Sequence, residues 1–333
     1  MSAGEVALEA PDVVTAGAPF EVTRTATINS NDFVAIAAPD AKDATLENYK
    51  RARDNLVVTL TAPAEPGLYE LRYVLDQGRS VIARRAIEVS SGEVALEAPD
   101  VVTAGAPFEV SRTATINSND FVAIAAPDAK DSALENYKRT RDSLVVTLTA
   151  PAEPGLYELR YVLDQGRSVI ARRAIEVSAG EVSLEAPDVV TAGAPFEVSR
   201  TATINSNDFV AIAAPDAKDS ALENYKRARD SLVVTLTAPA EPGLYELRYV
   251  LDQGRSVIAR RAIEVAAASV ELDAPATVTA GGEFEVARNT TVNVQDMLAM
   301  VPVGSADNEL GQSKRVRDHN PLAMKAPDEP GLY

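Results

Sequence analysis

The stretch PGLYELRYV at residues 154–162 decides the fold class of this chain. It opens with a tight turn, after which Tyr157, Leu159 and Tyr161 alternate with other side chains, as the buried face of a long β-strand does. A tyrosine just after a tight turn, at the start of the penultimate strand of a β-sandwich, is typical of a tyrosine corner. In that structure the hydroxyl reaches back to the backbone across the turn. We predict this structural role for three residues, Tyr69, Tyr157 and Tyr245.

The same stretch recurs with a period of 88 residues, at 66–74 and 242–250, together with its surroundings. Three copies are almost identical, and a diverged fourth copy keeps the register up to Tyr333. We therefore predict four domains. They are 4–91, 92–179 and 180–267, each a complete repeat, and 268–333, a repeat without its C-terminal part. Because the first residues match an internal junction and the last copy is incomplete, we expect a piece of a longer array.

The composition excludes several classes of protein. The 333 residues contain no cysteine, no tryptophan, one histidine and a formal net charge of −17. Disulfide scaffolds and thiolate metal sites are excluded, and a surface that binds nucleic acid is not expected at this charge. The only imidazole, His319, has no companion histidine or cysteine, so we interpret it as a turn residue. We expect no enzymatic activity, and no apolar run is long enough to insert into a membrane.

Each complete copy predicts an all-β module. In the second copy, short strands are expected at 93–97, 108–114, 121–125, 137–141, 144–149, 157–163 and 168–177. About seven strands separated by turn residues within 88 residues indicate an antiparallel β-sandwich of the immunoglobulin type. The predicted fold is therefore a tandem array of immunoglobulin-like modules, joined by short linkers.

The motifs LEAPD, AGAPFEV, NDFVAI, PGLYELRYV and IARRAIEV recur in the three complete copies, and the positions of the first three and the start of PGLYELRYV can still be followed in the fourth. Together they resemble the Ig-like tandem repeats of bacterial proteins that also carry a von Willebrand factor type A domain. More remotely, they are similar to the SKICH-like β-sandwich. The resemblance covers nearly the whole chain, and it implies a bacterial protein that is secreted, periplasmic or on the cell surface.

One position departs from the resembled repeats. Where those repeats usually have tryptophan after the FEV motif, this chain has Arg24, Arg112, Arg200 and Arg288. By alternation, Arg112 faces the core side of its strand, so a buried guanidinium would need hydrogen bonds or a partner of opposite charge. Two alternatives stay open. Either the side chain snorkels out to solvent at the strand end, or it forms an internal ion pair with Asp120 or Glu158.

Calcium is the one ligand ion for which the sequence offers candidates. Oxygen ligands come from one loop with Asn117, Asn119 and Asp120, and from the next with Asp128 and Asp131. They lack the spacing of an EF-hand, and the same residues are ordinary in turns. Calcium is thus an alternative, and no other cofactor is expected.

The candidates for interaction are a basic patch and an exposed aromatic residue in each copy. The patch consists of Lys138, Arg139 and Arg141 in the second copy. It is either a solvated face neutralised by neighbouring acids or a contact for acidic loops of an adjacent array. The aromatic residues are Tyr49, Tyr137 and Tyr225, which are the best placed to stack on a sugar.

The leading functional interpretation is a non-enzymatic, adhesive repeat array that acts as a spacer and as a multivalent protein-interaction surface. Its expected partners are other proteins or surface components, including further copies of itself. The alternative is a carbohydrate-binding or calcium-binding module presented in tandem. The fourth copy lacks the counterpart of 246–265, so we expect it to expose a sheet edge and to be less ordered or paired with another chain.

Overall fold

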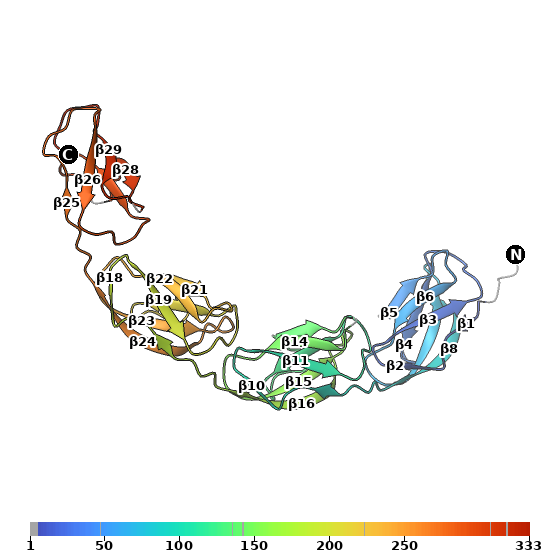
Figure 1. Ribbon diagram of the computed structural model, residues 1–333. Helices are drawn as coiled ribbons and strands as arrows, with labels where there is room; N and C mark the ends of the chain where they lie inside the picture. The colour runs from blue at the N-terminus through green and yellow to red at the C-terminus, as the bar shows by residue number, and fades with distance from the viewer. Residues whose placement is uncertain are drawn as a thin grey trace. The chain divides into compact units, whose positions relative to one another are not determined.

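The computed structural model describes residues 6–46, 48–134, 136–141, 143–222, 224–306, 308–317 and 319–333. The described chain is entirely β-structure and turns, and it divides into two units, Met1–Ala179 and Gly180–Tyr333. Each unit contains two of the four copies (Figure 1). Strands of one copy pair only with strands of the same copy, so each repeat builds its own sheets.

Every complete copy is a sandwich of a three-stranded and a five-stranded sheet, which confirms the predicted immunoglobulin-like fold. In the second copy the sheet orders are β14-β11-β9 and β10-β16-β15-β12-β13. The strands are β9 (Leu96–Glu97), β10 (Val101–Thr103), β11 (Pro107–Arg112), β12 (Phe121–Ala125), β13 (Asn136–Arg139), β14 (Val145–Thr149), β15 (Gly155–Val162) and β16 (Val169–Ser178).

The first and third copies repeat this arrangement at the same positions of the period. The first consists of β1 (Leu8–Glu9), β2 (Val13–Thr15), β3 (Pro19–Arg24), β4 (Phe33–Ala37), β5 (Asn48–Arg51), β6 (Val57–Thr61), β7 (Gly67–Val74) and β8 (Val81–Ser90). The third consists of β17 (Leu184–Glu185), β18 (Val189–Thr191), β19 (Pro195–Arg200), β20 (Phe209–Ala213), β21 (Asn224–Arg227), β22 (Val233–Thr237), β23 (Gly243–Val250) and β24 (Val257–Ala266).

The structure adds one strand to the seven expected. After β9 the chain turns at Pro99 and crosses to the other sheet, where β10 pairs with β16, residue Val102 opposite Val177. This pairing is parallel, in a module otherwise built of antiparallel pairs. The first predicted strand, 93–97, is correspondingly reduced to the two residues of β9, because only Leu96 and Glu97 lie opposite β11.

The core lies between the two sheets. Val110 and Leu148 from the three-stranded sheet meet Leu159, Tyr161 and Ile175 from the five-stranded one, and all five are buried. The predicted tyrosine-corner hydrogen bond is present, since the Tyr157 hydroxyl donates to the Glu153 carbonyl at 3.0 Å. Its counterparts are the bonds from Tyr69 to Glu65, from Tyr245 to Glu241 and from Tyr333 to Glu329.

The fourth copy forms the same first half of a sandwich without its closing strands. It consists of β25 (Leu272–Asp273), β26 (Glu283–Arg288), β27 (Met297–Met300), β28 (Gln312–Arg315) and β29 (Leu322–Lys325). Strands β27 and β28 form a two-stranded sheet, which leaves one edge of β27 without a strand neighbour among the described residues. Beside it lies an apolar hollow of about 570 Å³ with Leu272, Met297 and Val316 in its walls. The exposed edge and apolar face are as expected, and reduced order or pairing with another chain stays a prediction.

Candidate functional site between adjacent copies

Within the unit Met1–Ala179, a groove of about 770 Å³ lies between the first two copies. Its walls contain three features that the sequence indicated as separate candidates for binding. They are an exposed tyrosine, a basic patch and the Asn-Ser-Asn loop. The first copy contributes Pro19, Tyr49, Lys50, Arg51, Arg53, Val58, Thr59 and Thr61, and the second contributes Asn117, Ser118 and Asn119.

Tyr49 is held rigidly in the first wall. Its ring meets Phe33 edge to face, with centroids 5.2 Å apart and planes at 85°. The guanidinium groups of Arg51 and Arg79 lie 5.0 Å and 4.5 Å from the centroid of the same Phe33 ring. Packed in this way, Tyr49 is still 44% exposed, as are Tyr137 and Tyr225 in the other copies. A ring fixed before binding loses little conformational freedom when a ligand covers it.

The buried Arg24 side chain holds the loop that carries Arg53 through hydrogen bonds from the core side. The guanidinium of Arg24 donates to the backbone carbonyls of Ala52 and Asn55, and its Nε donates to the Thr27 hydroxyl at 3.1 Å. Arg53 itself adopts a left-handed backbone conformation with φ of 50°. Arg24 is therefore a positioning residue for this wall of the groove.

Neither expected environment of these arginines is found. Arg112 is only 4% exposed, so the prediction that its side chain snorkels out is wrong. It forms no ion pair among the described residues either, and donates instead to the Thr140 carbonyl at 2.8 Å and to the Ser143 carbonyl. Burial lowers the pKa of Arg112. The equivalent groups are Arg200, bound to the carbonyls of Ala228 and Ser231, and Arg288, bound to the carbonyl of His319.

The two proposed acidic partners have other contacts. Glu158 accepts hydrogen bonds from Arg160 and Arg172 on the outer face of the sheet, at 3.1 Å and 2.6 Å. Asp120 is buried, and its carboxylate accepts from the Tyr161 hydroxyl and from the amide of Asp164, both at 2.9 Å. Arg112 thus donates to carbonyl oxygens of the loop and to neither of these acids in the described contacts.

Asp120 and Tyr161 also fix the second wall of the groove. The Asp120 carboxylate accepts from the amide of Asn117, and the Tyr161 hydroxyl accepts from the amide of Ile116, both at 2.9 Å. Burial raises the pKa of Asp120 and that of Tyr161. Because the buried Asp120 carboxylate accepts hydrogen bonds from Asn117, Tyr161 and Asp164, it holds the loop 117–120 in place from its core side. No local pattern predicts this pair, because the two residues are 41 positions apart.

The calcium candidates do not converge on one point. The oxygen atoms of Asp120 have the partners just described, Asn117 Oδ1 accepts from the amide of Asn119 at 3.1 Å, and Asp131 pairs with Arg172 at 2.5 Å. Asp128 is exposed in the next loop. In the part of the chain that the structure describes, no three His, Cys, Asp or Glu residues form a group that could hold a metal ion.

A hydrogen bond connects two adjacent copies beside the groove, at the contact that we call the joint. Asn117 Nδ2 donates to the Gly17 carbonyl at 3.2 Å, and in the unit Gly180–Tyr333 the equivalent Asn293 Nδ2 donates to the Gly193 carbonyl at 3.1 Å. Gly17 has φ of 75°, and a Cβ atom there would lie 2.9 Å from the side chain of Leu163, which is fully buried. Glycine is thus required for both the backbone conformation and the close approach of the second copy.

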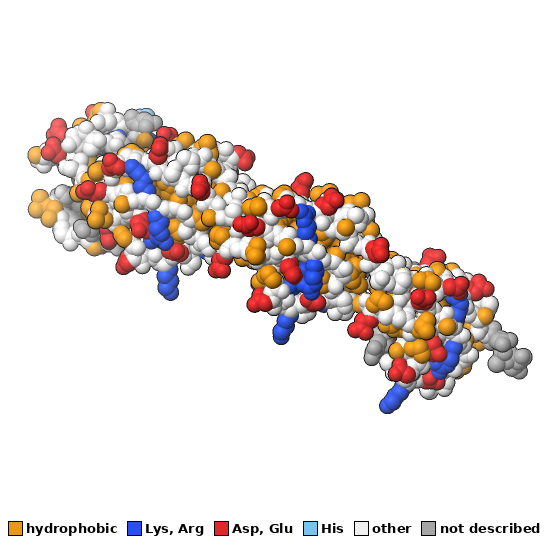
Figure 2. Space-filling model, turned by 90° about the horizontal axis from the view of Figure 1, so that it is seen from below, with side chains coloured by type: hydrophobic (Ala, Val, Ile, Leu, Met, Phe, Trp, Pro, Cys, Tyr) orange, Lys and Arg blue, Asp and Glu red, His pale blue; other side chains and the backbone are white. Residues whose placement is uncertain are grey.

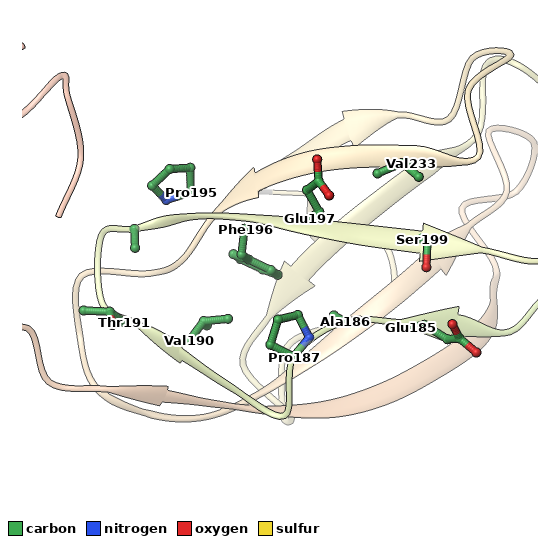
Figure 3. A pocket seen from close by; sticks show the side chains of 11 residues that line it. Glu185, Ala186, Pro187, Val190, Thr191, Pro195, Phe196, Glu197, Ser199 and Val233 are labelled. Carbon is green, nitrogen blue, oxygen red and sulfur yellow. The ribbon is translucent and has the colours of Figure 1, made fainter. Parts of the chain in front are cut away.

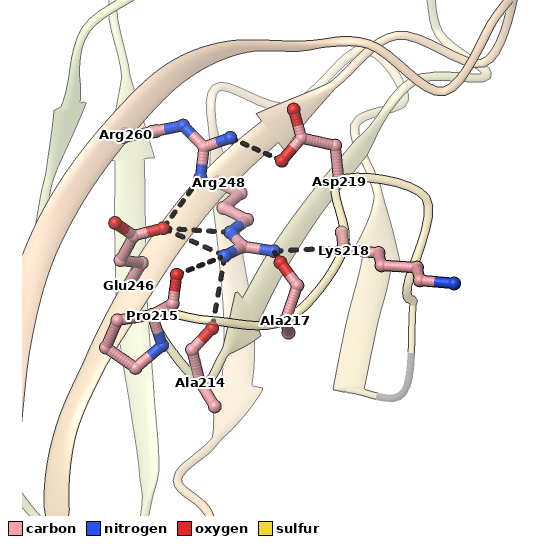
Figure 4. Close-up of polar contacts among 8 residues, drawn as sticks. All are labelled: Ala214, Pro215, Ala217, Lys218, Asp219, Glu246, Arg248 and Arg260. Carbon is pink, nitrogen blue, oxygen red and sulfur yellow. Dashed lines mark hydrogen bonds and ion pairs between the residues drawn. The ribbon is translucent and has the colours of Figure 1, made fainter.

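Arginine residues of the last two strands of a complete copy have a structural role on the outer face of the sheet. Figure 4 shows the third copy, where the buried Arg248 donates to the carbonyls of Ala214 and Ala217 at 3.1 Å and 3.0 Å. Glu246 accepts from Arg248 and from Arg260, which in turn pairs with Asp219 at 2.5 Å. This network fastens the loop after β20 onto the outer face of the sheet. On the face seen in Figure 2, some Lys and Arg side chains lie beside Asp and Glu, while others project away from the surface.

In the second copy, the predicted patch divides into residues with different surroundings. The Arg139 guanidinium lies 4.7 Å from the centroid of the Phe121 ring, and it donates to the Asn119 carbonyl at 2.9 Å. Lys138 is exposed, and Arg141 is exposed with φ of 47°.

A second hollow, of about 800 Å³, lies on the third copy beside β17, β18 and β19 (Figure 3). Phe196 and Pro187 form its apolar part, while the carboxylates of Glu185 and Glu197 lie well apart. Part of the same hollow recurs on the first copy, around Phe20.

No protein-family model and no curated protein matches this chain. Among solved structures, the Escherichia coli adhesin FdeC is 14% identical, covering 80% of this chain and 96% of that one, with a TM-score of 0.22. Chicken CNTN1 domains FN1–FN3 are 9% identical, covering 79% and 98%, with a TM-score of 0.23. The Yersinia pseudotuberculosis adhesin InvE is 13% identical, covering 52% and 59%, with a TM-score of 0.24.

The fold and the joints together define the class of this protein, a tandem array of immunoglobulin-like modules. No helix long and apolar enough to cross a membrane occurs among the described residues.

Proposed function

We propose that this chain is a non-enzymatic, adhesive array that spaces and presents a repeated protein-interaction surface outside a bacterial cell. In this proposal it belongs to a longer protein that also carries a von Willebrand factor type A domain, as the sequence resemblance implies. The partners are proteins or surface components, including other copies of the array.

One observation carries the proposal: the same exposed surface is built three times. Tyr49, Tyr137 and Tyr225 have equal exposure, and each packs on its own phenylalanine with the same geometry. Three equal weak sites on one chain give avidity without any new contact. Repetition of this kind suits adhesion, whereas catalysis would need only one constellation of residues.

The experiment is display of the chain on bacterial cells at different copy numbers. One strain displays the whole chain, a second displays the chain without 92–179, and a third displays it without 92–267. Because both deletions remove whole periods, they leave an equivalent junction in place. We expect cell aggregation to fall more steeply than the number of copies and to weaken in high salt. Aggregation that is the same in all three strains would refute the proposal.

A further inference from the structure

The strand that carries the exposed tyrosine lies at the open edge of its sheet. β5 is the last strand of the five-stranded sheet in the first copy, and β13 and β21 hold the same place in the second and third. One row of backbone N–H and C=O groups on each strand therefore has no strand partner among the described residues. Such a row is a template on which an extended peptide can form a further strand.

The charge at this edge is opposite to that of the whole chain. Lys50, Arg51 and Arg53 line the groove beside β5, and no carboxylate lines it. The ion pairs described in the first copy involve other arginines, Arg72, Arg84 and Arg85. In the second and third copies, the counterparts of Arg51 are Arg139 and Arg227, which lie 3.9 Å and 3.8 Å from the carboxylates of Asp164 and Asp252, while Lys138 and Lys226 have no described ion pair. In a chain of net charge −17, the β5 edge thus has three positive charges beside the groove, of which the Arg51 guanidinium also donates to the Asn31 carbonyl at 3.1 Å.

The same charges discriminate between possible strands. A second β5 edge would bring like charges opposite one another, which disfavours edge-to-edge pairing of two copies. An acidic strand would instead place carboxylates opposite Lys50 and Arg51, while its backbone pairs with β5. The exposed ring of Tyr49 adds an apolar contact for one side chain of the peptide on the same face of the sheet.

We propose that the β5 edge, together with the equivalent β13 and β21 edges, binds an extended acidic peptide segment of a partner protein by strand addition. This inference rests on the proposed interaction surface and names the chemistry of its partner. A saccharide could stack on the Tyr49 ring and bond to the threonine hydroxyls. It could not pair with a row of backbone N–H and C=O groups as a strand does. The position of the tyrosine on an edge strand therefore favours a peptide ligand.

The first test is a calorimetric titration of the whole chain with defined peptides. The probe is a short peptide of alternating Glu and Val, and the control has Gln in place of Glu. We expect the Gln peptide to bind at least about tenfold more weakly. The Glu peptide N-methylated at alternate residues should lose binding, because strand addition needs its N–H groups. Equal binding of the methylated peptide, or binding of an oligogalacturonate without binding of the peptide, would overturn the proposal.

The second test uses matched variants. Lys50→Ala, Lys138→Ala and Lys226→Ala together remove three charges from the edges, whereas Lys42→Ala, Lys130→Ala and Lys218→Ala remove three from exposed loops. We expect about tenfold weaker peptide binding in the first set and no change in the second. Equal loss in both sets would mean unspecific attraction and would contradict strand addition. Copy-dependent cell aggregation that persists without peptide binding would refute this inference alone and leave the proposed array function intact.

Discussion

At the scale of single residues, the unusual feature is a buried guanidinium that binds carbonyl groups instead of a carboxylate. Nη1 of Arg112 has no hydrogen-bond partner among the described residues, while Nη2 bonds to the Thr140 carbonyl. The charge is therefore costly, and its benefit is the order of the loop that follows β13. The side chain occupies the core-facing position where the resembled repeats have tryptophan, and it adds the polar contacts that a hydrocarbon could not make.

This environment predicts that Arg24→Leu, Arg112→Leu and Arg200→Leu together will destabilise the three complete copies, by about 2 kcal/mol in each copy. The carbonyl groups that these arginines satisfy would lose their donors while still largely buried. Replacement by Lys should cost less, since an ammonium reaches one carbonyl of each loop. Urea unfolding followed by circular dichroism measures the difference. A Leu variant as stable as the parent chain would show that the guanidinium contacts contribute nothing.

A second prediction at this scale concerns acid. Partial burial acts to raise the pKa of Glu158, but hydrogen bonds and charge from Arg172 and Arg160 outweigh it, so the pKa is lowered. Glu70 and Glu246 behave alike. A carboxyl whose pKa is lower in the folded state stabilises the protein above its unfolded pKa, and this stabilisation is lost as the pH falls through the folded value. The stabilisation contributed by these three carboxylates should therefore decline below about pH 4.3.

The variant Glu70→Gln, Glu158→Gln and Glu246→Gln should be less stable at neutral pH, by about 1 kcal/mol per copy. It should also lose less stability than the parent on acidification. Its control is Glu21→Gln, Glu109→Gln and Glu197→Gln, which removes the same charge from exposed strand positions. Thermal unfolding between pH 3 and pH 7 is the measurement. Parallel pH profiles of the first variant and the parent chain would contradict the role of the Arg-bound carboxylates.

At the scale of elements, alternation predicted those strands that have one face in the core. β11, β14 and β15 were placed to within one or two residues because their apolar side chains recur at every second position. β10 was missed, since three residues show no periodicity and its partner lies more than 70 positions away. The run FVAIA of β12 is buried on both faces, because the loop held by Arg160 covers its outer side. That cover is formed by contacts 30 or more positions apart, beyond any local pattern.

The tyrosine corner is the element for which a local signal did suffice, and it supports a further prediction. Tyr69→Phe, Tyr157→Phe and Tyr245→Phe should lower the free energy of unfolding by about 1 kcal/mol in each copy. The matched control, Tyr49→Phe, Tyr137→Phe and Tyr225→Phe, removes exposed hydroxyls and should be neutral. Chemical unfolding compares the two. If both sets cost the same, the hydroxyl bond to the turn is not what stabilises the strand start.

At the scale of the whole molecule, the candidate site exists only because two copies meet. Tyr49, Lys50 and Arg51 each resemble an ordinary surface residue when read alone. Asn117 reads as a turn residue, and its partner Gly17 lies 100 positions earlier, in another copy. The sequence therefore predicted residue types of the groove but not the groove itself. What the repeat does supply is the expectation that any joint will recur, and the bond from Asn293 to Gly193 shows this recurrence in the second unit.

The joint itself gives the last prediction, which concerns the unit Met1–Ala179. Asn117→Ala removes the only hydrogen bond described between its two copies, so their relative orientation should become less restricted. Because the chain has no cysteine, spin labels can be attached at Lys42→Cys and Lys130→Cys alone, both exposed. Pulsed electron spin resonance should then give a broader distance distribution in Asn117→Ala than in Asn119→Ala, which leaves the joint bond intact. Equal widths in the two variants would mean that the contact of Gly17 with Leu163 holds the copies together without the asparagine.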